Sequence, residues 1–159
     1  IVSGAVVNSL EWKGLALSFN VNYKLGYYFR KYSVFYSDVL NANWAHGDYG
    51  KRWQYPGDEV YTSVPSRPST SNNSRDAFYS YSQPLINRGD HIRLQDINLS
   101  YYPRDRGIKK LPFSSMQIYL YINNLGILWK ANSAGLDPDY FFSDYKPPIT
   151  YSIGVKVGF

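Results

Sequence analysis

Apolar and polar residues alternate along this chain with a period of two, which is typical of β-strands that have one apolar face. The longest alternation runs from Leu15 to Phe29, with an apolar or aromatic residue at every odd position. A strand of this length rises about 50 Å, and about 35 Å if it is tilted by about 45°. The pattern predicts one strand that is longer than the apolar band of an outer-membrane barrel, which is about 25 Å tall.

Four further runs predict four more strands. They are Val6 to Trp12, Ile92 to Tyr101, Met116 to Asn123 and Tyr151 to Phe159. The first ends at a Lys13-Gly14 turn, and the second changes phase at Gln95-Asp96, where one extra residue predicts a β-bulge. No segment of useful length has a helical period, although one turn fits Arg106 to Lys110. The predicted fold class is all-β, which leaves nucleotide-binding βαβ units and helix-turn-helix readers without support.

The connections between these strands differ greatly in length. The turn at Lys13-Gly14 and the segment 103–113 are short, whereas the segments 31–90 and 124–149 are long. A loop of about 60 residues is uncommon in a compact soluble domain. Transmembrane barrels have short turns on one side and long loops on the other. We therefore predict that 31–90 and 124–149 are extracellular loops and that 103–113 is a periplasmic turn.

Aromatic residues are abundant, with 17 Tyr, 8 Phe and 4 Trp among 159 residues. Those expected at the side of the short turns are Trp12, Tyr101, Tyr102, Phe113 and Phe159, and those expected at the opposite side are Tyr27, Phe29 and Tyr151. Two aromatic girdles around an aliphatic band are typical of a barrel in a membrane. A soluble sandwich also alternates and carries aromatic residues at the ends of its core, so this explanation stays open.

Charge follows the same two faces. The apolar face carries no charge through the middle of any predicted strand, where a charge facing lipid would cost about 2–4 kcal/mol. Five strands do not close a barrel, and an open edge in lipid leaves backbone groups without hydrogen bonds. We therefore expect one arc of a larger transmembrane β-barrel, with outer-membrane lipid and the rest of the same barrel as its partners.

Seven segments of the sequence carry a family resemblance. They are 89–101, 119–125, 135–139 and the alternating end at Phe159, together with 51–54, 56–59 and 75–78 upstream. In their order along the chain they resemble the C-terminal end of the SusC/RagA family of TonB-dependent outer-membrane transporters. The resemblance implies a 22-stranded barrel in the outer membrane of a Gram-negative cell, filled by a plug domain. It also implies a SusD/RagB-like surface lipoprotein as partner, and nutrient import of oligosaccharides or peptides.

The resemblance assigns these residues to the last five strands of the barrel. Plug domain and TonB box are absent from the sequence, so contact with TonB is expected through a missing N-terminal part. The chain begins at Ile1 without a charged segment before an apolar one, and we expect it to belong to something longer or processed. The last strand also resembles the signal for barrel assembly, carried by Tyr151, Ile153, Val155, Val157 and Phe159. The other explanation is that Phe159 is one more girdle aromatic.

Candidate contacts with the substrate or with the SusD/RagB-like lipoprotein, which would act as a lid, lie in the long loop. They are Trp44, Tyr49, Lys51, Arg52, Trp53, Tyr55, Arg75, Tyr79 and Tyr81. Aromatic faces stack on sugars and Arg donates in a fork to carboxylates, so these residues would serve a glycan or a peptide. It is equally possible that the rings only pack the loop against itself. Lys24, Arg30 and Arg93 are predicted to face the lumen and tune selectivity, or simply to face water or the plug.

The sequence gives little support to catalysis, cofactors or metals. The two histidines, His46 and His91, lack partners at a metal-ligand spacing, Cys is absent, and no Gly-x-Ser-x-Gly elbow is present. Asp137-Pro138-Asp139 with Asp144 suits a turn better than calcium. We predict no enzyme, no cofactor and no metal site.

The basic residues Arg104, Arg106, Lys109 and Lys110 suit a solvated turn better than nucleic acid, because the formal net charge is only +5. Two alternative functions stay open. One is a secreted β-sandwich that binds glycans through surface aromatic residues. The other is a small eight-stranded outer-membrane barrel, with or without enzyme activity, that needs three more strands within residues 31–90.

Overall fold

The computed structural model describes residues 1–41, 44–103, 114–142 and 146–159. The chain forms two units, Ile1–Tyr27 with Gly89–Phe159, called here the sheet unit, and Tyr28–Arg88, called the insert unit. The insert unit therefore interrupts the sheet unit in sequence. Among the described residues, no helix has the length and apolar character needed to cross a lipid bilayer.

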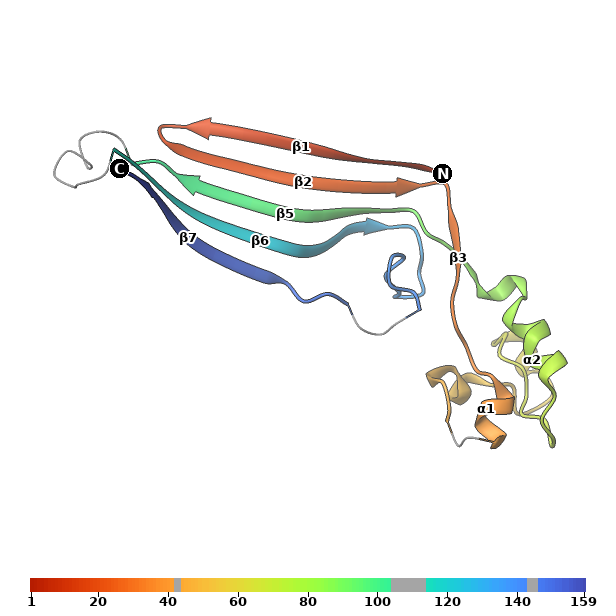
Figure 1. The fold of residues 1–159 in the computed structure, drawn as a ribbon. Helices are drawn as coiled ribbons and strands as arrows, with labels where there is room; N and C mark the ends of the chain where they lie inside the picture. The colour runs from red at the N-terminus through yellow and green to blue at the C-terminus, as the bar shows by residue number, and fades with distance from the viewer. Residues whose placement is uncertain (42–43, 104–113, 143–145) are drawn as a thin grey trace. The chain divides into compact units, whose positions relative to one another are not determined.

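Five antiparallel strands form the sheet unit (Figure 1). They are β1 (Val2–Trp12), β2 (Leu15–Leu25), β5 (His91–Tyr101), β6 (Ser115–Lys130) and β7 (Thr150–Gly158), in the order β1-β2-β5-β6-β7. Strands β1 and β7 are the two edges, so the sheet of the described residues is open. The prediction of an all-β fold that forms an unclosed arc is confirmed.

The register gives the sheet one apolar and one polar face. Val6 lies opposite Val21, and Leu99 lies opposite both Leu17 and Leu120, on what we call the apolar face. Residues one position along point to the other side, called the polar face. The charged strand residues on the polar face are Glu11, Lys24, Arg93, Asp96, Lys130 and Lys156. The separation predicted from the alternation is therefore present across the whole sheet.

The predicted turn and bulge are both confirmed. Lys13 and Gly14 have φ angles of 48° and 90°, and two central residues with positive φ are what a two-residue hairpin turn requires. Asn20 pairs with Asp96 and Val21 with Leu94, which leaves Gln95 as the extra residue of the bulge.

Two strand ends differ from the prediction. The strand expected from Leu15 to Phe29 ends at Leu25, because Gly26 has a φ of 75° and turns the chain away from the sheet. The strand expected to end at Asn123 continues to Lys130, so the second long loop begins at residue 131 rather than at 124. Asn124 (φ 59°) and Gly126 (φ 122°) lie where the register shifts, and this irregularity hides the strand from a period of two.

These ends also change the aromatic girdles. Trp12 and Tyr101 lie at one end of the apolar face, and Tyr151 at the other end is joined by Trp129, which the shorter predicted strand had missed. Phe29 was wrongly assigned to a girdle, because it lies in the insert unit and is buried. Phe113 is outside the described residues.

The insert unit contains short elements around a small core. They are β3 (Tyr28–Arg30), α1 (Tyr36–Asn41), α2 (Asn73–Ser80), β4 (Ile86–Arg88) and the 3₁₀ turns Gly47–Lys51, Asp58–Val60 and Gln83–Leu85. Strands β3 and β4 pair with each other, and the core residues are Val34, Tyr36, Val64, Tyr79 and Leu85. The prediction that no helix forms was wrong for α2, which begins after the N-cap Asn72. The described part of residues 31–90 does not hold the three strands that a small barrel needs.

Candidate functional site

Side-chain amides and hydroxyls form hydrogen bonds across the polar face. Asn20 Nδ2 donates to Asp96 Oδ2 at 3.2 Å, and Gln117 Nε2 donates to Ser100 Oγ at 3.0 Å. The bulge residue Gln95 donates through Nε2 to Asn123 Oδ1 at 3.1 Å. This wall offers donors and acceptors to water or to a polar ligand.

Cationic side chains gather where β2 and β5 meet. Lys24 pairs with His91 in the register, and Asn22 pairs with Arg93, so all three long side chains leave the same face of neighbouring strands. We call Lys24, His91 and Arg93 the cationic site. The alternation of the strands explains its composition, because Lys24, His91 and Arg93 occupy polar positions between the apolar residues of the opposite face.

Two carboxylates from the loop after β6 occupy the cationic site. Asp139 Oδ1 lies 2.7 Å from Lys24 Nζ, and its Oδ2 lies 3.1 Å from His91 Nε2 and 3.3 Å from Arg93 Nη2. Asp137 Oδ1 accepts from Arg93 Nη2 at 2.6 Å. Charge-assisted hydrogen bonds of this kind are roughly twice as strong as neutral ones. The loop is thereby docked on the polar face by its own acidic residues.

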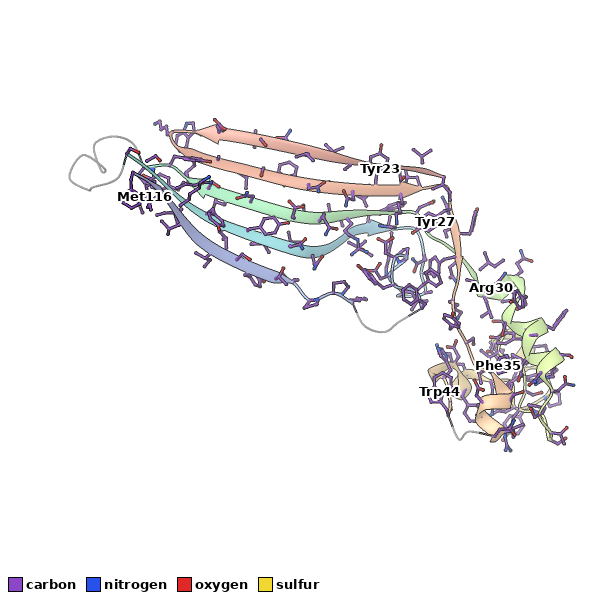
Figure 2. All side chains as sticks on the ribbon, viewed as in Figure 1. Tyr23, Tyr27, Arg30, Phe35, Trp44 and Met116 are labelled. Carbon is purple, nitrogen blue, oxygen red and sulfur yellow. The ribbon has the colours of Figure 1, made fainter. Side chains whose placement is uncertain are left out.

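Two hydrogen bonds to backbone oxygens also hold the same loop. Ala131 N donates to Asp90 O at 2.9 Å, and Lys130 Nζ donates to Leu136 O at 3.0 Å. Asp139 N donates to Asp137 Oδ1 at 3.0 Å, and Pro138 between them is fully buried. The Asp-Pro-Asp sequence therefore forms a tight turn, as expected of these residues. Figure 2 shows the side chains of this loop gathered at the end of the sheet, near Tyr27.

His91 is 2% exposed and has an oxygen at each ring nitrogen. Its Nδ1 lies 2.9 Å from Gly89 O and 3.2 Å from the hydroxyl of Tyr27, and its Nε2 faces Asp139. The Gly89 carbonyl and the Asp139 carboxylate, which can only accept, therefore face different nitrogens of the His91 ring.

The charges near this loop shift the pKa of two groups outside the strands. Burial, with the negative charges of Asp139, Asp137 and Asp90, raises the pKa of Tyr27 to about 12. Burial alone would raise the pKa of Asp139, but the hydrogen bond from Lys24 and the charges of His91, Lys24 and Arg93 outweigh it and hold the pKa below its usual value. Asp139 is therefore a carboxylate at neutral pH.

A hollow of about 1110 Å³ lies next to the cationic site. Its lining includes Lys24, His91, Arg93, Lys130, Asp137, Asp139 and Lys146. The four Lys and Arg side chains outnumber the two carboxylates, so the lining carries an excess of positive charge. Within the described ranges, no group of three His, Asp or Glu side chains is arranged to hold a metal ion. Asp137 and Asp139 are paired with cations, and Asp144 of the calcium hypothesis lies outside the described residues.

Of the three residues predicted to face the lumen, the structure brings together two. Lys24 and Arg93 share the polar face and the docked loop. Arg30 belongs instead to β3 of the insert unit (Figure 2). Its guanidinium lies 4.5 Å from the ring centroid of Tyr81. The strand expected to lead up to Arg30 ends at Leu25, so Arg30 is not among the residues of the polar face.

The predicted contact residues of the long loop divide into exposed and packed ones. Trp44, Tyr55 and Tyr81 are exposed by 58%, 72% and 71%, Lys51 is also exposed, and Trp53 is partly so. Tyr79 instead lies in the core of the insert unit with Tyr49 packed against that core, so packing explains both rings.

The two arginines of this group are also engaged inside the insert unit. Arg52 lies 4.2 Å from the ring centroid of Tyr49, and Arg75 lies 5.3 Å from that of Tyr36 and donates to Ser66 O. Trp44, Lys51, Tyr55 and Tyr81 keep the most accessible side chains of the predicted set.

The last strand carries its predicted side chains on one face. Tyr151, Ile153, Val155 and Val157 pair with apolar-face residues of β6 and are exposed, as is Phe159. The basic cluster Arg104, Arg106, Lys109 and Lys110 lies outside the described residues.

The sequence did not predict the docked loop, nor the contacts that His91 and Lys130 make with it. The available signal was the complementary charge of Asp137 and Asp139 on one side and Lys24 and Arg93 on the other. Nothing local indicates that these residues meet, because Arg93 and Asp137 are 44 positions apart.

Solved structures of transport proteins share this fold. A chain of the RagAB peptide importer in the "open-open" state is 19% identical, with a TM-score of 0.63 over 99% of this chain and 17% of that chain. A chain of the importer in the "closed-closed" state is 17% identical, with a TM-score of 0.61 over 98% of this chain and 17% of that one. A further RagAB peptide transporter chain gives 17% identity and a TM-score of 0.57, over 92% of this chain and 16% of that chain.

The chain thus spans about a sixth of the length of these solved chains. No family model matches the sequence, and no curated protein matches it at a significant level. At this identity the likeness defines a shared fold: an arc of antiparallel strands like part of a transporter chain.

Proposed function

We propose that this chain forms part of the wall of a SusC/RagA-like TonB-dependent transporter in the outer membrane of a Gram-negative cell. The observation that carries the proposal is the five-stranded sheet, which is open at both edges, apolar on one face and charged only on the other. A closed barrel with lipid outside and water inside is the environment that satisfies both faces and both edges.

The exposed apolar face supports contact with lipid. Val6, Leu10, Ile153 and Val155 are each more than half exposed, although they are apolar. Exposed apolar surface of this extent marks an interaction site. In the proposed barrel, β1 would pair with the strand that precedes it and β7, as the last strand, with the first strand, since each edge otherwise exposes a row of backbone groups.

The two long connections support a cell-surface side for one end of the strands. The connections β2 to β5 and β6 to β7 leave the sheet at one end, and the tight turn after β1 lies at the other. In outer-membrane barrels the long loops are extracellular and the short turns periplasmic. On this basis the exposed Trp44, Lys51, Tyr55 and Tyr81 would contact the substrate or a SusD/RagB-like lipoprotein.

The proposed activity is import of oligosaccharides or peptides, powered through TonB by a part of the protein outside this sequence. The solved chains that share the fold come from peptide importers, which favours peptides. The alternative of a secreted β-sandwich lacks a counterpart sheet, because the described residues contain only one other sheet, with two strands of three residues.

Membrane extraction and uptake test the proposal together. The full-length protein should stay in the membrane pellet after an alkaline carbonate wash and require detergent for extraction. Deleting its gene, or that of TonB, should abolish uptake of a fluorescent neutral peptide or oligosaccharide. Recovery as a folded monomer in aqueous buffer without detergent would overturn the proposal.

A further inference from the structure

We propose that the cationic site of Lys24, His91 and Arg93 binds a carboxylate of the transported ligand, and that Asp139 of the loop is an internal ligand that this carboxylate displaces. The inference rests on the proposed transport function and names the chemistry of the substrate. The carboxylate would be borne by an acidic peptide or by a uronic-acid oligosaccharide.

The geometry around Asp139 already is that of a bound carboxylate. One oxygen lies 2.7 Å from an ammonium, and the other lies within 3.1 Å of an imidazole nitrogen and 3.3 Å of a guanidinium nitrogen. Both oxygens of Asp139 are therefore held, by side chains from two neighbouring strands. A carboxylate from another molecule would find the same donors in the same positions.

The site has more positive charge than its internal carboxylates neutralise. The two carboxylates of the lining, Asp137 and Asp139, form ion pairs with Arg93 and Lys24. Lys130 and Lys146 line the same hollow, so the lining has two more positive than negative side chains. Arg93 Nε is buried and has no hydrogen-bond partner among the residues that the structure describes. A partly buried position strengthens attraction for an anion, because water screens the charges less than in bulk.

Asp139 can leave without dismantling the loop. Its side chain is 24% exposed, whereas that of Asp137 is 5% exposed. The loop keeps the hydrogen bond of Ala131 N with Asp90 O and that of Lys130 Nζ with Leu136 O, and Arg93 keeps Asp137. A ligand carboxylate that replaces Asp139 therefore exchanges one set of hydrogen bonds for an equal one, and the hollow of about 1110 Å³ gives it room.

Fluorescence anisotropy on the full-length protein in detergent tests the inference. The probes carry an uncharged dye, and the peptides have an acetylated N-terminus and an amidated C-terminus. They are octapeptides that alternate Glu with Gly or Gln with Gly, and tetramers of galacturonic acid and of galactose. The Glu peptide or the galacturonate should bind at least about tenfold more tightly than its neutral counterpart, which corresponds to about 1.4 kcal/mol. Whichever of the two anionic probes binds, the peptide or the oligosaccharide, identifies the source of the carboxylate.

Three variants separate this site from general electrostatics. Asp139→Asn removes the internal competitor and should tighten binding of the anionic probe about tenfold, leaving the neutral probe unchanged. Lys24→Gln should weaken binding of the anionic probe by a similar factor. Lys156→Gln removes a charge that lies on the polar face of the sheet, on β7 and outside the cationic site. It should change binding of the anionic probe less than about twofold.

A measurement on the unmodified protein covers the case in which a variant does not fold. Raising the salt concentration from about 50 to about 500 mM should weaken binding of the anionic probe and leave binding of the neutral probe unchanged. Equal binding of charged and neutral probes, no tightening in Asp139→Asn, or equal effects of Lys24→Gln and Lys156→Gln would each overturn the inference. If the neutral probe is still imported through this membrane protein, the transport function stands and only the carboxylate site fails.

Discussion

Gly154 on β7 lies directly opposite Tyr119 on β6, and the tyrosine ring covers it. Gly4 on β1 and Tyr23 on β2 form a second pair of this kind, with the hydroxyl of Tyr23 2.6 Å from where a Cβ of residue 4 would be. A glycine weakens a strand because it has no side chain to pack, and an aromatic ring across the ladder restores that packing. Each pair therefore acts as one packing unit.

Replacing Gly154 with Ala tests this at the scale of a residue. The new Cβ would collide with the Tyr119 ring, so we expect a loss of about 1–3 kcal/mol, as is usual for overpacking. Thermal unfolding, followed by the change in gel mobility of the folded barrel, measures the loss. In a Tyr119→Ala background the same substitution should cost little, and an equal cost in both backgrounds would contradict the pairing.

Tyr36 gives a prediction for alkaline pH. It is 1% exposed, its hydroxyl donates to Pro65 O, and burial raises its pKa from 10.0 to about 12. The folded pKa lies above the unfolded one, so the stability that the protonated phenol contributes is present below about pH 10 and is lost as the pH rises through about 12. A shift of this size corresponds to about 2–3 kcal/mol.

The absorbance of ionised tyrosine between pH 9 and 13, compared between the protein and its Tyr36→Phe variant, measures this group alone. The difference should show one phenol titrating near pH 12. A difference that titrates near the ordinary value of 10.0 would show that the ring is not buried in solution.

At the scale of elements, the β1–β2 hairpin depends on its two turn residues. Gly14 has a φ of 90°, and a Cβ there would lie 2.6 Å from the carbonyl oxygen of Tyr102. Gly14→Ala should therefore lower stability by about 1–3 kcal/mol, through backbone strain and this contact. Lys13→Asn is the matched control, because Asn tolerates the positive φ of 48° at that position and should preserve or raise stability. Thermal unfolding of the two variants compares them, and equal losses would argue against this turn.

At the scale of the whole molecule, the two faces of the sheet decide which substitutions the membrane tolerates. Val6 and Val7 are neighbours in the middle of β1, both more than half exposed, but Val6 pairs with Val21 on the apolar face and Val7 with Asn20 on the polar face. Val6→Arg places a charge toward lipid and should cost about 2–4 kcal/mol, whereas Val7→Arg faces water and should cost much less.

Urea unfolding of the full-length barrel in lipid vesicles measures both variants. Because residue type and exposure are matched, the difference between them reports only the medium that each face contacts. Equal and small effects would indicate that neither face contacts lipid, and would count against the membrane assignment.

The features that depend on neighbouring residues were predictable from the amino-acid sequence alone. A period of two identified the five strands of the sheet unit and their two faces, because successive side chains of a strand must point to opposite sides. Gly14 marked the turn, and the change of phase at Gln95 marked the bulge. The positions of Lys24 and Arg93 on the polar face followed from the same alternation.

The ends of the strands and the pairing of the charges depend instead on contacts between distant parts of the chain. The alternating run that begins at Leu15 is interrupted at Gly26, and Arg30 lies in the insert unit. Strand β6 contains irregular residues and still pairs with β5 on both sides of them. Asp-Pro-Asp has the composition of a turn, of a calcium ligand and of a docking segment alike. Which of these it becomes depends on Lys24 and Arg93, whose approach is set by strand pairing over long sequence separations and leaves no local pattern.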